Sequence, residues 1–559
     1  MKKRLLLICI AASTLSYSQH RNMRLLDNWD DNSIPTNASG YSYSEVFGFV
    51  FNGREYGVIG STQGAHIIDV TKPDSIYEVD FVPGQFRGNV THRDYDVHDN
   101  HLYMVCDQGQ SGLQVADLTY LPDSVHVVYD SKNLFVKSHN IFIDSSQDIL
   151  YSCGGSTSTG SNDLMMIDIS IPSAPSLISN LANDVTWWSS FIGYVHDIYV
   201  ENNIAYTNDN DAMHIVDMSN PTMPLILGTL SSYSDQGYNH SGYLSTNDTT
   251  YVMCDETHGK RTKVVDVSNP ASITVTDLDG PYVPNSTAIA HNPIIRGDYA
   301  YVSYYYDGVQ VFDITDKYNM KNIAHYDTYL GPNAAGGEGC WGVYPLLPSG
   351  IVLASDRRRG LFVLQHLTTP EISFKNPNST YNEYDGMQHV YVSLSNELDD
   401  TVKVMVDIDT ANSTGDWNVD YSSSAVFPLE LVFEPGTTLD SIPFLLIDNM
   451  DIESTETIIF KLSLPTNGDI SSPSVDTVFI KDNEFVGLVE REKNNLLLYP
   501  NPINSGQEVN FSYSTNYQIF DATGKIVASG LGSKVKTDTF SKGIYLVKFG
   551  NKTEKLIIH

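Results

Sequence analysis

The chain has 559 residues, too many for a single hydrophobic core, so we expect several domains. Its 67 acidic residues outnumber 33 basic ones and give a formal net charge of −34. A surface this negative repels phosphate, which excludes nucleic acid as a partner, and it suits a protein that stays soluble outside the cell.

The N-terminal residues have the pattern of a secretory leader. Met1–Arg4 is basic, Leu5–Ala12 is apolar, and Ser16–Ser18 supplies small residues before Gln19. We therefore predict a signal peptide over residues 1–18. Its apolar run is too short to span a bilayer and no later stretch is long enough, so we expect an exported chain without a transmembrane span.

Four cysteines follow the leader, and export permits disulfides. Cys106, Cys153 and Cys254 hold similar places on predicted second strands of a repeat, which favours burial as small apolar side chains. A bridge between Cys106 and Cys153 is the alternative.

A motif of strand-forming residues that ends in Asp recurs about every fifty residues, and a decayed copy with Gln365 in the Asp position closes the series. A strand repeat of this length is typical of propeller blades. We predict an all-β chain that begins with a seven-bladed β-propeller over residues 19–368. A Ser or Thr follows each Asp closely, so the Asp is expected to accept backbone N–H groups in a turn. The repeated aspartates are Asp69, Asp117, Asp168, Asp217, Asp266 and Asp313.

The two ends of the predicted propeller are expected to share one blade. The seventh unit runs out after its third strand, near Leu367. We predict that Met23–Leu26 supplies the missing outer strand, because this mixing of chain ends removes open sheet edges.

Five of the seven units open their inner strand with a histidine. Inner strands line the channel of a propeller, so equivalent residues at their starts would form a ring around its axis. Imidazoles in such a ring could bind Zn²⁺ or another transition metal, or an anion when protonated, and acidic residues after the second strands could complete the site. The candidates are His92, His139, His196, His240 and His291, together with Asp107, Asp209, Asp255 and Glu256.

The alternative interpretation of these histidines is structural. A repeated His that is followed by a short polar residue would hydrogen-bond within each blade, and every blade needs such a bond. Trp341 stands near this position in the seventh unit, and the first unit has no His there.

The repeat resembles that of the LVIVD-repeat proteins, and the larger pattern resembles the choice-of-anchor B family of exported bacterial propellers. The resemblance covers roughly residues 23–368, and it implies the propeller fold and a surface location but no established reaction. The strings that carry it are Gly53–Pro73, Ser138–Ile143, Asn239–Leu244, Ala290–Pro293 and Gly339–Leu364.

Residues 369–485 have longer strands at regular spacing, which is typical of an antiparallel β-sandwich. Asp416–Tyr421, Phe433–Gly436, Ile447–Glu456 and Ile480–Glu484 resemble a Calx-beta domain. That family binds Ca²⁺ through acidic residues at one end of the sandwich, and a solvated acidic rim is the alternative. The matching residues are Asp420, Asp448, Glu453, Glu456 and Asp482, whereas Asn449 and Asn483 stand where a second Asp is common.

A charged linker is predicted over residues 486–495, and residues 496–559 form a third, small β-sandwich-like unit. From Arg491 onward nine basic residues face five acidic ones. This tail resembles the type A sorting domain of the type IX secretion system, by which Bacteroidota move cargo across the outer membrane. The resemblance implies recognition by that machinery and a place on the cell surface or outside the cell. The motif residues are Tyr499, Pro500, Asn501, Pro502, Gly543, Tyr545 and Lys548.

The sequence contains no nucleophile elbow, zinc-protease helix, phosphate loop or dinucleotide fingerprint. We therefore expect a surface binding or adhesion protein whose propeller face or axial channel holds a glycan, a peptide or a protein. A metal-dependent hydrolase that uses the axial histidines, with a bound water as nucleophile, and a passive component of the envelope are the alternatives.

Overall fold

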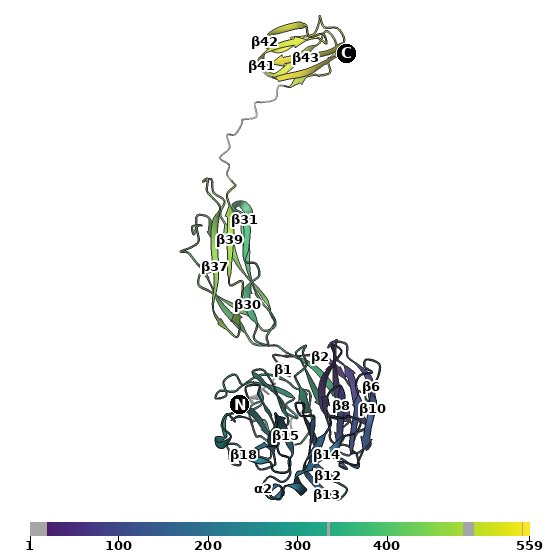
Figure 1. The fold of residues 1–559 in the computed structure, drawn as a ribbon. Coiled ribbons are helices and arrows are strands. Elements are labelled where there is room, and N and C mark those ends of the chain that lie inside the picture. The colour runs from purple at the N-terminus through teal and green to yellow at the C-terminus, as the bar shows by residue number, and fades with distance from the viewer. Residues whose placement is uncertain (1–18, 332–335, 484–496, 551) are drawn as a thin grey trace, which may run out of the picture. The chain divides into compact units, whose positions relative to one another are not determined.

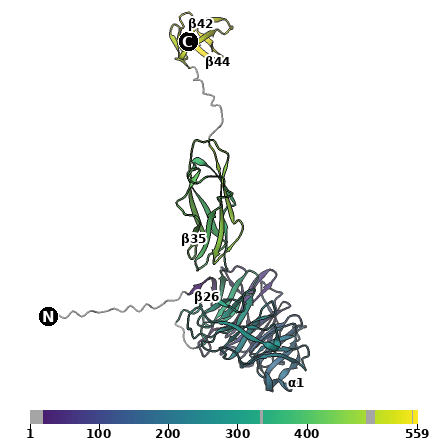
Figure 2. The same ribbon diagram turned by 90° about the vertical axis from the view of Figure 1, so that its left-hand side faces the viewer.

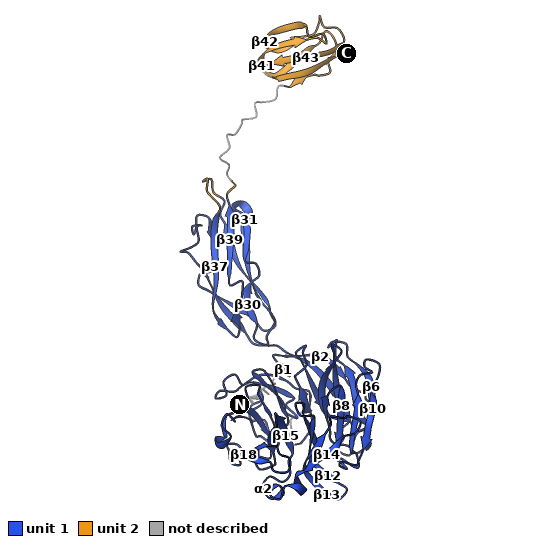
Figure 3. Cartoon of the chain, viewed as in Figure 1, with its two compact units in different colours: residues 1–448, 456–481 blue, residues 449–455, 482–559 orange. Residues whose placement is uncertain are grey.

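The computed structural model describes residues 19–331, 336–483, 497–550 and 552–559. The predicted leader over residues 1–18 and the predicted linker over residues 486–495 lie outside these ranges. The chain divides into two compact units: one takes Met1–Asp448 and Glu456–Lys481, and the other takes Asn449–Thr455 and Asp482–His559 (Figure 3). Within the described residues, no helix has the length and apolar character that crossing a bilayer requires.

The first unit begins with a β-propeller of seven sheets, counted over the described residues (Figure 1). The first strands of the sheets contact one another in a closed circle, so they line the axis. These inner strands are β3 (Tyr43–Phe51), β7 (Arg93–His98), β11 (Asn140–Asp144), β15 (Asp197–Glu201), β19 (Asn239–Leu244), β23 (Pro293–Arg296) and β27 (Cys340–Tyr344).

Two further strands follow in each blade, and the third carries the repeated Asp. The second strands are β4 (Arg54–Ser61), β8 (His101–Cys106), β12 (Ile149–Thr157), β16 (Ile204–Asn208), β20 (Thr250–Asp255), β24 (Tyr299–Ser303) and β28 (Ile351–Asp356). The third strands are β5 (Gly64–Asp69), β9 (Leu113–Asp117), β13 (Gly160–Asp168), β17 (Met213–Asp217), β21 (Thr262–Asp266), β25 (Val309–Asp313) and β29 (Gly360–His366).

The outer strands complete the blades, and the last of them comes from the N-terminal end. They are β6 (Tyr77–Pro83), β10 (His126–Ser131), β14 (Ser176–Asn180), β18 (Leu225–Leu230), β22 (Thr274–Asp279), β26 (Lys321–Tyr326) and β2 (Met23–Trp29). Strand β2 pairs antiparallel with β29, so Met23 lies opposite His366. The predicted closure is confirmed, and β1 (His20–Arg21) adds a fifth strand to the sheet of β26.

Short helical turns occupy the connections between strands. They are α1 (Leu181–Asp184), α2 (Trp188–Phe191), η1 (Pro270–Ser272) and, in the following domain, η2 (Glu383–Asp385).

The repeated Asp has the structural role predicted for it. In six blades its Oδ1 accepts the backbone N–H of the Ser or Thr two residues later, as Asp217 does from Ser219 at 2.9 Å. This bond ends the third strand in a tight turn. The cysteines at 106, 153, 254 and 340 are buried and free, so the alternative of a bridge is not seen.

A β-sandwich of two five-stranded sheets follows the propeller (Figure 2). The pairs β30–β38 and β31–β39 are parallel, and the other pairs are antiparallel. One sheet holds β34 (Tyr421–Ser422), β36 (Leu439–Leu446), β32 (Met387–Leu394), β30 (Glu371–Phe374) and β38 (Asp469–Ile470). The other holds β31 (Asn378–Asn382), β39 (Val475–Lys481), β37 (Glu456–Thr466), β33 (Val402–Ile408) and β35 (Leu429–Phe433).

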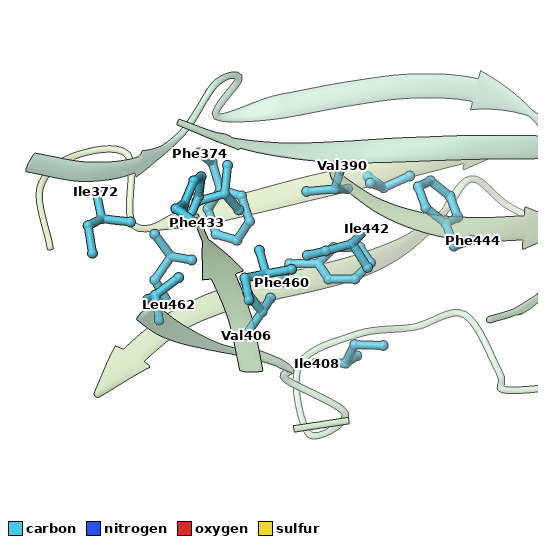
Figure 4. Packing of buried hydrophobic residues seen from close by; sticks show 14 of the residues in the cluster. Ile372, Phe374, Val390, Val406, Ile408, Phe433, Ile442, Phe444, Phe460 and Leu462 are labelled. Atoms are coloured by element: carbon cyan, nitrogen blue, oxygen red, sulfur yellow. The ribbon is translucent and has the colours of Figure 1, made fainter. Parts of the chain in front are cut away.

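The core of the sandwich lies between its two sheets (Figure 4). Phe374 and Val390 come from one sheet, and Phe433, Phe460 and Val406 face them from the other. The alternation of buried and exposed residues along β33 and β39 is the pattern that one buried face imposes on a strand.

The second unit contains a small sheet with its own core, which includes Val509, Phe511, Val547 and Leu556. Its strands are β40 (Leu498–Tyr499), β41 (Glu508–Phe520), β42 (Ile526–Lys536), β43 (Gly543–Phe549) and β44 (Lys552–Ile558).

Candidate functional site

The five predicted histidines meet around the propeller axis, and Trp341 completes the circle. Neighbouring ring centroids in this axial ring are 4.0 to 5.4 Å apart, with the longest step between Trp341 and His92. The first blade contributes no histidine to this circuit, as its sequence predicted. The members of the axial ring are His92, His139, His196, His240, His291 and Trp341.

Three of these histidines make the same bond to the next blade. The Nδ1–H groups of His196, His240 and His291 donate to the backbone oxygens of His240 (3.2 Å), His291 (3.1 Å) and Trp341 (2.6 Å). The structural alternative expected bonds within each blade, whereas these bonds join adjacent blades. Because Nδ1 carries the proton, Nε2 of each ring is left with its lone pair.

The other two histidines have side-chain partners. Nε2–H of His92 donates to Oδ1 of Asn140 at 2.9 Å, and Nδ1–H of His139 donates to Oδ2 of Asp107 at 3.1 Å. Burial opposes ionisation of Asp107, yet hydrogen bonds from His139 and Lys137 lower its pKa to about 2. Asp107 is therefore an anion that orients His139.

Of the three further acidic candidates, only Glu256 reaches the axial ring. Its Oε2 lies 3.7 Å from Nε2 of His240, and its Oε1 accepts the hydroxyl of Tyr305 at 2.6 Å. Asp209 instead accepts from His214 at 2.9 Å, and Asp255 pairs with Lys263 at 3.2 Å.

Burial makes the axial imidazoles weak bases. It lowers the pKa of His92 to about 3 and that of His240 to about 4. It also holds the pKa of His196 and His291 well below the ordinary value, and neighbouring imidazoles add to the effect. These four side chains are neutral at physiological pH, so anion binding by imidazolium is disfavoured.

The inner strands continue from the axial ring along a cavity of about 270 Å³, the channel cavity. Four carboxylates line it, together with two amides and five aromatic side chains of the inner strands. The described lining residues include no Lys, Arg or His. The polar lining residues are Glu45, Asp94, Asp96, Asp197, Asn140, Asn292 and Ser145, and the aromatic ones are Phe47, Tyr95, Phe142, Tyr243 and Tyr344.

The carboxylates of the channel cavity have backbone N–H groups as partners but no basic side chain in the described lining. Asp94 accepts from Ile141 at 2.7 Å, Asp96 from Ile143 at 2.8 Å and Asp197 from Ile198 at 2.9 Å. Glu45 accepts from its neighbour Val46 and, at 3.1 Å, from the amide of Asn292. Burial raises the pKa of Glu45 to about 7 and that of Asp197 to about 6, and it raises the pKa of Asp94 well above the ordinary value. A positive charge in the cavity would reverse these shifts.

The sequence contains a signal for part of this cavity in the residues that follow the axial histidines. Asn140, Asp197 and Asn292 each directly follow an axial histidine. In these three blades the residue after His therefore lines the channel cavity, whereas Ser241, which follows His240, is not among the lining residues. Glu45 and Asp94 have no repeated counterpart, so nothing in the period pointed to them.

The predicted calcium ligands divide between the two compact units. Asp420 is 4% exposed, its Oδ1 has no hydrogen-bond partner, and one of its oxygens lies within 4.8 Å of an oxygen of Glu456. Asp448 belongs to the same unit, whereas Glu453 and Asp482 belong to the other. There the backbone N–H of Glu453 donates to Oδ2 of Asp482 at 2.8 Å.

The sorting-motif residues lie on strands β40 and β43 of the C-terminal sheet and on the segment that follows β40. Tyr499 ends β40, and the amide of Asn501 donates to the backbone oxygen of Lys555 at 2.6 Å and accepts from Ile557 at 2.9 Å. Gly543, Tyr545 and Lys548 lie on β43, which pairs with β44. The remaining motif residues, Pro500 and Pro502, flank Asn501.

Family models match three parts of the chain in the predicted order. The LVIVD repeat matches residues 159–183, 192–231, 260–277 and 289–328. The Calx-beta domain matches residues 368–484, and the secretion system C-terminal sorting domain matches residues 497–559. The chain thus carries LVIVD repeats, a Calx-beta domain and a sorting domain that indicates export to the cell surface or the extracellular space.

Solved structures similar to parts of the chain include the apo form of the Calx CBD1 domain and the WD40 repeats of RRP9. The Calx domain is 21% identical, with 21% of this chain and 99% of that chain covered and a TM-score of 0.19. The RRP9 repeats are 9% identical, with 61% of this chain and 97% of that chain covered and a TM-score of 0.43. No curated protein matches the sequence.

Proposed function

We propose that this protein is exported to the cell surface or beyond it, and that its propeller binds a ligand carrying an ammonium group in the channel cavity. The observation that carries the proposal is the lining of that cavity, where four carboxylates meet no basic side chain among the described residues.

Charge complementarity is the first argument. Burying an ionised carboxylate costs free energy unless a cation or several hydrogen bonds compensate it. Glu45, Asp94 and Asp197 have raised pKa values because burial penalises their charged forms. An ammonium group between them supplies the missing positive charge and donates hydrogen bonds to their oxygens.

The remaining walls favour an organic cation over a bare metal ion. The rings of Phe47 and Tyr344 pack with their centroids 4.7 Å apart at an interplanar angle of 49°, and Ile141 and Ile198 add apolar surface. Aromatic faces attract ammonium groups, and apolar walls accommodate a carbon chain. Among the described residues, no three cavity carboxylates bring their oxygens within 4.8 Å of one another. The carboxylates are therefore too far apart to bind one small metal ion together.

The C-terminal sorting domain supports a location outside the cell. The sorting domain is the part that the type IX machinery would recognise.

We also propose that the Calx-beta domain binds Ca²⁺, because Asp420 keeps a buried oxygen without a partner beside Glu456. Calcium would supply positive charge to these oxygens and stiffen that end of the sandwich. A melting temperature that Ca²⁺ raises in the wild type but not in Asp420→Asn tests this assignment.

The ammonium proposal is tested by calorimetric titration with n-pentylamine and with n-pentanol, which has a similar shape but no charge. The amine should bind and the alcohol should bind at least about tenfold more weakly, since a charge-assisted hydrogen bond contributes roughly 1.5–3 kcal/mol. Glu45→Gln and Asp197→Asn should weaken amine binding by a similar factor.

Glu201→Gln is the matched control, because Glu201 lies on the same strand as Asp197 but is exposed at its far end. Equal binding of the amine and the alcohol, or an equal effect of all three substitutions, would reject the proposal.

A further inference from the structure

Two histidines of the axial ring and Glu256 bring three possible metal-ligand atoms close together. One nitrogen each of His196 and His240 and one oxygen of Glu256 all lie within 4.8 Å of one another. Nε2 of His240 is 3.7 Å from Oε2 of Glu256. Two bonds of about 2.1 Å at a tetrahedral angle place two ligand atoms about 3.4 Å apart, so this spacing suits a shared metal ion.

The protons of these groups are already engaged elsewhere. Nδ1–H of His196 and Nδ1–H of His240 donate to backbone oxygens of the next blade. The lone pair of His240 Nε2 therefore faces a carboxylate oxygen, and two acceptors at this distance repel each other unless a cation lies between them.

The supporting contacts are those that metal ligands usually have. A metal-ligating His commonly donates its other N–H to a backbone carbonyl, and a ligating carboxylate is itself hydrogen-bonded. His196 and His240 meet the first condition, and the Tyr305 hydroxyl on Oε1 of Glu256 meets the second.

A further buried atom in the ring lacks a partner. His92 is 3% exposed, and its Nδ1 has no hydrogen-bond partner. A buried nitrogen without a partner costs free energy, and a ligand that reaches this nitrogen would offset that cost.

We infer that His196, His240 and Glu256 hold a divalent transition metal ion of the zinc class. Two imidazoles and one carboxylate form a donor set that zinc accepts, and a fourth position stays open for water or an external ligand. This site lies on the axial ring and is separate from the ammonium site proposed for the channel cavity.

His291 provides a matched control for the structural alternative. It makes the same interblade bond as His196 and His240, but it does not belong to the group of three ligand atoms. A purely structural role predicts equal effects for all three histidines, whereas metal binding separates His291 from the other two.

The test titrates Co²⁺ and Zn²⁺ into the chelator-treated protein from residue 19 onward. One equivalent of Co²⁺ should give the visible absorption of a tetrahedral site, and Zn²⁺ should displace it. The fluorescence of Trp341, whose ring lies 4.4 Å from that of His291, should fall with the same midpoint.

The variants decide between the two roles. His196→Gln and Glu256→Gln should each lower the affinity for Co²⁺ by more than about 100-fold, because the loss of a contact that only supports a ligand costs at most about that factor. His291→Gln should bind Co²⁺ as the wild type does. The Glu256 side chain is 29% exposed, so Glu256→Gln is expected to fold even if a buried His variant does not. Failure of the wild type to bind one equivalent, or equal loss of binding in His291→Gln, would overturn the inference.

Discussion

Lys263→Met should destabilise the propeller strongly, because it leaves a buried carboxylate without its cation. The side chains of Lys263 and Asp255 are both fully buried, and Lys263 Nζ lies 3.2 Å from Oδ2 of Asp255. Removing one partner of such a pair costs roughly 3–5 kcal/mol. Asp255 keeps the hydroxyl of Tyr233 at 2.9 Å and the N–H of Gly237 at 2.6 Å, so we expect about 3 kcal/mol, the lower end.

Urea denaturation followed by tryptophan fluorescence measures this loss, since Trp29, Trp187, Trp188 and Trp341 all lie in the propeller. The double variant Lys263→Met/Asp255→Asn removes the stranded charge. Its amide oxygen can accept from the N–H of Gly237, and its NH2 group can donate to the hydroxyl oxygen of Tyr233. It should recover most of the stability, leaving a loss of about 1 kcal/mol.

A loss below about 1 kcal/mol in the single variant, or no recovery in the double variant, would show that Asp255 is not held as a buried anion. Because Asp255 directly precedes Glu256, the single variant should also weaken Co²⁺ binding at the axial ring, as expected for a positioning residue.

Three further predictions follow from the fold and the cavity. Deleting residues 19–31 removes the strand that closes the last blade. Calorimetry should show the melting temperature of the propeller fall by roughly 10 °C or more, since each kcal/mol of lost stability lowers it by about 2–4 °C. An unchanged melting curve would contradict the closure. Binding of n-pentylamine should strengthen as pH rises from 5 to 8. Glu45 and Asp197, whose pKa values are raised to about 7 and about 6, lose protons over this range and become negatively charged. Weaker binding of the amine at higher pH would contradict a role for these carboxylates as anions. Asp217→Ala should cost about 1 kcal/mol at pH 7 by freeing the N–H of the turn, whereas Gln365→Ala, in the blade that lacks the Asp, should cost almost nothing; equal costs would argue against the turn bond.

The parts of the architecture that repeat were the parts that the sequence predicted. Asp217 and its counterparts occupy one position in a period, so a turn role assigned to one applied to the others. The axial ring followed for the same reason, since residues at equivalent strand starts must meet at the axis of a propeller. The closure by β2 followed from the missing strand of the last blade.

The parts that do not repeat could not be read in this way. Asp209 and Asp255 stand at similar places after their second strands, yet one binds a third-strand His and the other a third-strand Lys. Glu256 follows Asp255 in the chain, and at this position its carboxylate reaches His240 of the axial ring. Glu45 meets Asn292 only because the propeller closes, which brings the first blade close to the sixth across the channel.

The pairing of Met23 with His366 also sets an order on folding. The edge of β29 stays open until both ends of the propeller are present, and the entropy of closing so long a loop must be offset before the last blade contributes stability. A chain that passes through a membrane from its N-terminus therefore carries β2 as an unpaired strand throughout that passage. The propeller becomes whole only when its entire length shares one compartment, so a stalled chain exposes two sheet edges that can pair with other chains.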